Sequence, residues 1–99
     1  MKNTAVISTR MRVFLLLYNE HWVYSKDIRD HLRHNYINMS SAGFYQMMAS
    51  MEQEELVTKE REYCKAANCM VTKYRLKPKT TLIIRQMYLD LKDKDNDRD

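Results

Sequence analysis

The chain has 99 residues, of which 44% are hydrophobic and 30% charged, and its formal net charge is +4. This length allows one domain with a modest core, and the composition is that of a folded protein rather than of a disordered one. No apolar run approaches the roughly 20 residues that cross a bilayer, and the segment MKNTAVISTR lacks the apolar stretch of a signal peptide. We therefore expect a cytoplasmic location.

The sequence offers little material for catalysis or metal binding. Cys64 and Cys69 are too few for a disulfide scaffold, and in a reducing compartment we expect them to be free thiols. Their spacing, without paired histidines nearby, is also unsuitable for zinc. No nucleophile lies beside a base, and a chain with one glycine has no phosphate loop. We predict a protein that is not an enzyme and that binds no metal, cofactor or small-molecule ligand.

Three helices are predicted in the first half of the chain. The first covers residues 8–20, begins at Ser8 or Thr9, and has an apolar face made of Met11, Phe14, Leu15 and Tyr18. The second is capped by Ser25, runs to about residue 34, and buries Ile28 and Leu32. The third begins at Ser40 or Ser41, ends near residue 55, and has an apolar face made of Phe44, Met48 and Met51.

Residues 56–77 alternate in hydrophobicity with the period of strands, which predicts a hairpin. No glycine occurs at its tip, so we expect a turn of more than two residues in which Asn68 takes a positive φ. Residues 63–79 contain five basic side chains and no acidic one, whereas residues 52–62 contain five acids. Positive charge is therefore expected to concentrate in the hairpin.

A fourth helix is predicted after Pro78, which ends the second strand, with Thr80 or Thr81 as its cap. Its apolar stripe consists of Ile84, Met87, Tyr88 and Leu91. The last eight residues, KDKDNDRD, are all charged or amide, and we expect them to be disordered.

The order of these elements is that of a winged helix-turn-helix, an α+β and mostly helical fold with three helices, a two-stranded wing and here an additional C-terminal helix. The stretch SSAGFYQMMASMEQEELV, residues 40–57, resembles the recognition-helix region of PadR-type transcriptional regulators, and matching positions are held by Tyr45, Met48, Met51, Leu56 and Val57. The tripeptide at 74–76, YRL, resembles the end of their wing. Glu55 stands where these proteins usually have a glycine, and the shorter C-terminal region suggests a minimal version.

The resemblance implies that the third helix enters the major groove of double-stranded DNA while the wing lies along the backbone. Gln46 is the candidate for base recognition, because its amide can pair bidentately with adenine. Tyr45 either contacts phosphate or packs against the second helix, and Arg29 and Arg33 are expected to add backbone contacts. At the start of the third helix a phosphate is expected to be held by Ser40, Ser41 and the amides of Ala42 and Gly43. The predicted DNA-binding residues are Ser40, Ser41, Ala42, Gly43, Tyr45, Gln46, Ser50, Lys59, Arg61, Lys65 and Lys73.

The fourth helix is expected to form a homodimer, because a lone amphipathic helix cannot leave its apolar stripe in water. The predicted dimer contacts are Ile84, Met87, Tyr88 and Leu91. We thus expect a DNA-binding domain at 1–79, a dimerisation helix at 80–92 and a disordered tail at 93–99. The predicted function is transcriptional repression; a protein-interaction module on the same fold, or a replication or partition protein of a phage or plasmid, remain alternatives.

Overall fold

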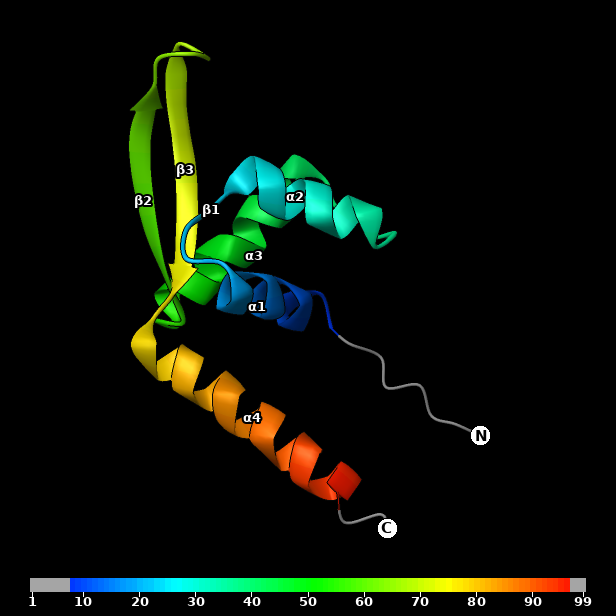
Figure 1. Ribbon diagram of the computed structural model, residues 1–99. Helices are drawn as coiled ribbons and strands as arrows, with labels where there is room; N and C mark the ends of the chain where they lie inside the picture. Colours follow the sequence, from blue (N-terminus) through cyan, green and yellow to red (C-terminus); the bar gives the residue numbers. More distant parts are fainter. Residues whose placement is uncertain (1–7, 97–99) are drawn as a thin grey trace.

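The computed structural model describes residues 8–96, apart from the side chains of Tyr88 and of residues 90–96. Its elements follow in the order α1 (Thr9–Asn19), β1 (Val23–Tyr24), α2 (Ser25–His34), α3 (Ser41–Gln53), β2 (Val57–Cys64), β3 (Cys69–Leu76) and α4 (Pro78–Asn96) (Figure 1). The predicted mostly helical α+β architecture, with a wing and an additional C-terminal helix, is confirmed. The wing, residues 57–76, extends beyond the helices on one side, and α4 leads away on the other (Figure 1).

Serine hydroxyls cap two of the helices as predicted. Ser8 Oγ accepts a hydrogen bond from the N–H of Met11 at 3.1 Å, and Ser40 Oγ accepts one from the N–H of Gly43 at 3.0 Å. Each bond satisfies one of the N–H groups that a helix leaves unpaired at its start. The prediction for α2 was wrong, because Ser25 is the first helical residue and the N-cap, Tyr24, has no side-chain cap bond.

Two helices end in Schellman motifs that contain no glycine. At the end of α3, the N–H of Glu55 donates to the carbonyl of Glu52 and the N–H of Leu56 donates to the carbonyl of Met51, both at 2.9 Å. Glu55 takes a φ of 61° in this motif, and Tyr36 takes a φ of 63° in the equivalent motif after α2. Both residues therefore occupy the left-handed region that glycine normally fills.

The sheet has three antiparallel strands in the order β1-β3-β2. The short link after α1 thus adds a third strand to the two predicted, pairing Val23 with Tyr74. The register between β2 and β3 runs from the pair Val57–Leu76 to the pair Cys64–Cys69. Four residues connect these strands, and Asn68 has a φ of 53°, which confirms the longer turn and its positive φ.

The core lies between the base of the wing and the first three helices, and the predicted buried faces of α2 and α3 are confirmed. In α1 the predicted face was only partly right, because Phe14 and Tyr18 pack against the core without being fully buried. Val13 and Leu17 are the buried residues, whereas Leu15 is 39% exposed. Because α1 contacts β3, α2 and α4, its apolar side chains find partners in more than one direction.

The start of α4 is fastened to the base of the wing. Thr80 Oγ1 donates to the carbonyl of Leu56 at 2.8 Å, and Thr80 is 3% exposed. One turn later Ile84, 5% exposed, joins the core. The helix begins at Pro78 and ends at Asn96, so it extends past the expected end at 92 and includes residues 93–96 of the expected tail; residues 97–99 lie outside the described residues.

Candidate nucleic-acid interface

The outward face of α3 is polar but uncharged. Residues 41–51 contain no acidic or basic side chain, and the exposed positions among them are Ser41, Ala42, Tyr45, Gln46, Ala49 and Ser50. The side-chain amide of Gln46 forms no hydrogen bond with any other residue in the described range 8–96. Ser50 differs, because its hydroxyl donates to Glu54 Oε2 at 3.1 Å. The face therefore presents one amide with all its hydrogen-bonding groups available to a ligand.

The first turn of α3 was predicted to hold a phosphate with its N–H groups. The N–H of Gly43 is used by the Ser40 cap, so the amides that remain at this exposed end are those of Ser41 and Ala42. A Cβ on Gly43 would lie 3.1 Å from Ser40 Oγ, closer than the cap hydroxyl tolerates without moving. Gly43 thus serves the cap, which corrects its predicted role as a phosphate donor.

Tyr45 connects α3 to the start of α2. Its hydroxyl donates to Ser25 Oγ at 3.4 Å, and its ring meets that of Phe44 edge-on with centroids 5.0 Å apart. The side chain nonetheless remains 45% exposed. Of the two predicted roles, the contact with the second helix is the one present in the structure.

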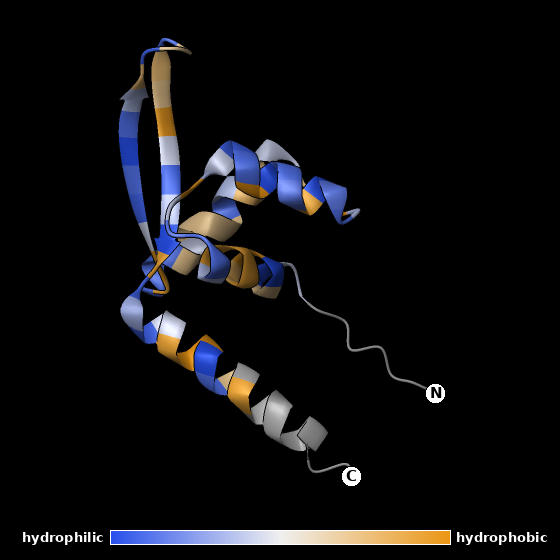
Figure 2. Cartoon of the chain, viewed as in Figure 1, coloured by the Kyte–Doolittle hydropathy of each residue, from blue (hydrophilic) through white to orange (hydrophobic). Residues whose placement is uncertain are grey.

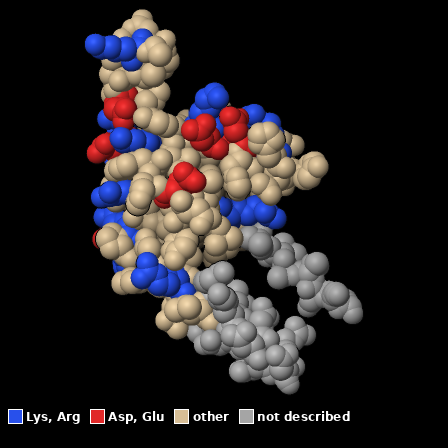
Figure 3. Space-filling view, viewed as in Figure 1, with Lys and Arg blue, Asp and Glu red and all other residues tan. Residues whose placement is uncertain are grey.

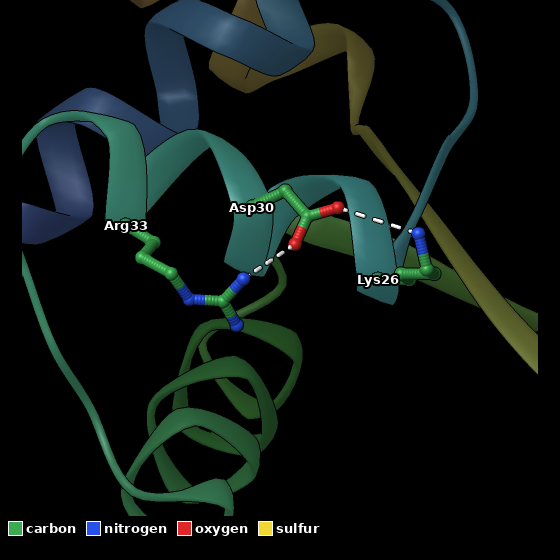
Figure 4. A network of polar contacts seen from close by, with 3 residues as sticks. All are labelled: Lys26, Asp30 and Arg33. Carbon is green, nitrogen blue, oxygen red and sulfur yellow. Dashed lines mark hydrogen bonds and ion pairs between the residues drawn. The ribbon is translucent and has the colours of Figure 1, made fainter.

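A carboxylate occupies the middle of α2 and pairs with two of its cations. Asp30 lies 3.4 Å from Lys26 Nζ and 2.9 Å from the Arg33 guanidinium (Figure 4). Desolvation alone would raise the pKa of Asp30, but the hydrogen bonds and charges of Lys26 and Arg33 outweigh it and lower that pKa. Arg33, predicted to contact DNA, is therefore already paired, whereas Arg29 lies over the Phe44 ring, 5.6 Å from its centroid.

The wing is less basic than its sequence suggested. Register places the acids of β2 beside the bases of β3, so that Lys73 Nζ lies 2.7 Å from Glu62 and 3.4 Å from Glu60. The hydrogen bond from Lys73 lowers the pKa of Glu62, and the same bond raises the pKa of Lys73. The Lys73 side chain is only 17% exposed. It is a poor phosphate ligand, contrary to the prediction.

The other predicted cations of the wing divide into paired and available groups. Lys59 Nζ lies 3.6 Å from Glu52, at the base of the wing. Arg61 and Lys65 are exposed, and in the part of the chain that the structure describes they form no ion pair. Figure 3 shows the same pattern, with basic and acidic atoms adjoining along the wing and basic atoms at its tip.

A groove of about 480 Å³ separates the wing from the start of α2. Tyr24 and Tyr45 line it together with Glu62, whose carboxylate accepts from the Tyr24 hydroxyl at 3.3 Å. Lys26 also lines the groove, and its side chain is 84% exposed. Lys26 and Tyr24 were not among the predicted residues, because only the pairing of β1 with β3 brings the start of α2 next to the wing.

Trp22 was also not among the predicted residues, and its ring contacts two cations of β3. Lys73 Nζ lies 4.9 Å from its ring centroid and the Arg75 guanidinium lies 4.8 Å away, which is the geometry of a cation–π contact.

Among residues 8–96 no group of three or more possible metal-binding side chains comes together. Over the same range, none of the helices combines the length and the apolar character that crossing a bilayer requires.

The geometry of helices, wing and C-terminal helix matches that of two solved structures. One is a PadR-like transcription factor from Bacteroides fragilis, with a TM-score of 0.61 and 16% identity, covering 89% of this chain and 90% of that one. The other is a PadR family transcriptional regulator from Eggerthella lenta, with a TM-score of 0.62 and 17% identity, covering 89% of this chain and 79% of that one. The fold is PadR-like. A scan of protein-family models and a search of curated proteins by sequence gave no match.

In this PadR-like fold the predicted dimer contacts on α4 are only partly available. Ile84 is buried in its own core because the Thr80 bond turns that side of the helix inward, so it cannot serve as predicted. Met87 is 44% exposed, while the side chains of Tyr88 and Leu91 lie outside the described residues. The prediction missed three other exposed apolar residues: Leu82, Ile83 and Leu89. Figure 2 shows apolar positions along the part of α4 that leads away from the core.

Proposed function

We propose that the protein is a transcriptional repressor that binds specific sites in double-stranded DNA, with α3 in the major groove and the wing tip against the backbone. The observation that carries the proposal is the uncharged outward face of α3, where the side-chain amide of Gln46 has no hydrogen-bonding partner within residues 8–96. Both solved structures of similar fold are described as transcription factors or regulators, which supports the proposal.

Base recognition is assigned to Gln46. A glutamine amide presents one donor and one acceptor in a plane, the pattern that matches N7 and N6 of adenine. The small side chains of Ala42 and Ala49 beside it let the helix backbone approach the base edges. Ser50 is a weaker candidate than its exposure suggests, since its hydroxyl already bonds to Glu54.

Phosphate contacts are assigned to cations that form no ion pair among the side chains that the structure describes. Arg61 and Lys65 supply them from the wing, and Arg29, which lies over the Phe44 ring, supplies one from α2. Each neutralised phosphate releases counterions, so affinity should fall steeply with salt. Lys73 and Lys59 contribute less, because binding DNA would require them to give up their partners Glu62 and Glu52.

The proposed functional unit is a homodimer formed through α4. Its exposed apolar residues Leu82, Ile83, Met87 and Leu89 range from 44% to 61% exposure, and Leu15 of α1 adds a further exposed leucine. A second copy would cover this surface, and a two-fold dimer would place two copies of α3 on half-sites about one DNA turn apart.

The test is binding to a fluorescein-labelled duplex of random sequence, followed by anisotropy across a series of salt concentrations. Wild type should bind at low salt, and the slope of log affinity against log salt should become shallower by roughly 0.9 for each phosphate that a variant no longer neutralises. Lys65→Ala should show this change. The matched control is Arg85→Ala, which removes an exposed charge from α4 and should leave the slope unchanged.

Failure of the wild-type protein to bind duplex DNA at low salt would refute the proposal and direct the search to protein partners. An equal effect of Lys65→Ala and Arg85→Ala would instead refute the assignment of backbone contacts to the wing tip, because it would indicate a diffuse dependence on net charge.

A further inference from the structure

The two cysteines lie directly opposite each other at the end of the wing. Cys64 is the last residue of β2 and Cys69 the first of β3, and they form the final pair of the antiparallel register. Directly opposed residues in such a pair have their side chains on the same face of the sheet, with Cα atoms roughly 4.5–5.5 Å apart. This separation lies within the range in which a disulfide can form.

The surroundings of the pair leave it open to reaction. Both cysteines are free thiols in the structure; Cys69 is exposed and Cys64 is half-buried. Cys64 lines the groove between the wing and α2 together with Ala67 and Met70. One thiol is therefore accessible to a small reagent from solvent, while the other lies beside it, positioned to react second.

We propose that Cys64 and Cys69 form a reversible oxidation site, a cross-strand disulfide that closes the wing tip. The oxidant is a low-molecular-weight disulfide such as glutathione disulfide. The Cys69 thiolate attacks one sulfur of the reagent, forms a mixed disulfide and releases one glutathione thiolate. The Cys64 thiolate then attacks the Cys69 sulfur, which forms the intramolecular disulfide and releases the second. The protein loses two protons and two electrons, and the reagent is reduced to two thiols.

The disulfide would act on the turn that carries Lys65. The turn comprises residues 65–68, and the side chains of Tyr63 and Asn68 already hydrogen-bond across it. Closing it covalently restricts the positions that Lys65 can take before it meets a phosphate. This part of the inference rests on the proposed DNA-binding function, and it predicts that the oxidised protein binds duplex DNA roughly threefold more tightly, because less freedom is lost on binding.

The first experiment follows the chemistry without DNA. The purified reduced protein is incubated with excess glutathione disulfide, and its intact mass and free thiols are measured. Wild type should lose both thiols and the mass of two hydrogen atoms, with no glutathione retained. Cys64→Ser is the control, since it should stop at a stable glutathione adduct on Cys69. An adduct that persists in wild type, chains linked to one another, or thiols that do not react would each overturn the site.

The second experiment compares the affinities of the reduced and oxidised proteins for the random-sequence duplex, with Cys64→Ser treated identically. A gain that occurs in wild type, is absent from the variant and is reversed by dithiothreitol supports the role of the disulfide. An intramolecular disulfide that leaves affinity unchanged would overturn the effect on binding. If reduced wild type binds no duplex, the proposed function fails and the effect on binding fails with it, but the mass measurement still decides whether the site exists.

Discussion

Tyr74 lies in β3 with 3% of its surface exposed, so ionisation of its phenol would lower the stability of the fold. Desolvation, with smaller electrostatic contributions from Tyr45 and Glu52, raises the pKa of its phenol to about 12. In the unfolded chain the Tyr74 phenol has its ordinary pKa of 10.0. The burial of the neutral phenol therefore contributes its full stabilisation below pH 10. The contribution is lost as pH rises through about 12.

We therefore predict that the free energy of unfolding falls between pH 10 and pH 12 by about 2–3 kcal/mol more in wild type than in Tyr74→Phe. Denaturant unfolding at a series of pH values would measure it. Lys73 is retained in both proteins, so the difference between them isolates Tyr74. Parallel curves for wild type and variant would contradict the assignment.

Single residues also mark the limit of what the sequence could indicate about the site. Gln46 on an exposed helix face follows from the helical period alone, and the structure places it there. The pairing of Lys73 with Glu60 and Glu62 does not, because it depends on which residues of two strands face each other. The basic run at 63–79 was visible, but its neutralising partners lie earlier in the chain.

The turns that end α2 and α3 store backbone strain at Tyr36 and Glu55, where φ is 63° and 61°. A side chain in this region costs about 1 kcal/mol relative to glycine. Tyr36 is 94% exposed, so removing its side chain sacrifices almost no burial. The strain therefore arises from the left-handed backbone conformation at the helix ends and not from the packing of the side chains.

We predict that Tyr36→Gly and Glu55→Gly each stabilise the fold by about 1 kcal/mol and raise Tm by about 4–8 °C. Thermal unfolding followed by circular dichroism measures both. Tyr36→Ala and Glu55→Ala are the matched controls, because alanine retains the Cβ that causes the strain and should give no comparable gain. Equal effects of glycine and alanine would show that the strain is not the cause.

Hydrophobic periodicity predicted the position and the buried face of α2 and α3, in which apolar residues recur at helical intervals between polar ones. It identified the buried face of α1 only in part, because residues 13–18 are all apolar or aromatic and fit several faces equally. Similarly, β1 has only two residues, and its pairing with β3 was not predicted from the sequence. Tertiary contacts, rather than sequence patterns, decide which face of a contiguous apolar run is buried and where a very short strand pairs.

Within residues 8–96, α4 is a helix whose exposed apolar side chains are not covered by the other elements. Thr80 and Ile84 fasten its first turns, whereas Leu82, Ile83 and Leu89 remain 46–61% exposed. The sequence indicated an amphipathic helix, but its rotation depended on the bond from Thr80 to Leu56, which no pattern reveals. As a result Ile84, which is buried in the core of its own chain, was wrongly predicted to contact a second copy.

We predict that Ile83→Glu dissociates a homodimer while leaving the domain folded, because its side chain is 54% exposed in the single chain. Sedimentation equilibrium would show monomers for the variant and a dimer for wild type. Lys79→Glu, a charge change at an exposed site near the start of the same helix, should leave the dimer intact. A monomeric wild type, or a variant that still dimerises, would exclude α4 as the interface.

Recognition of specific base pairs by α3 can be tested by selecting bound sequences from a random pool of DNA duplexes. Wild type is predicted to enrich a two-fold symmetric motif with half-sites about one helical turn apart. With Gln46→Ala the same selection should lose preference for an adenine within each half-site while retaining general affinity for DNA. Binding without enrichment of any motif, or the same motif with Gln46→Ala, would contradict it.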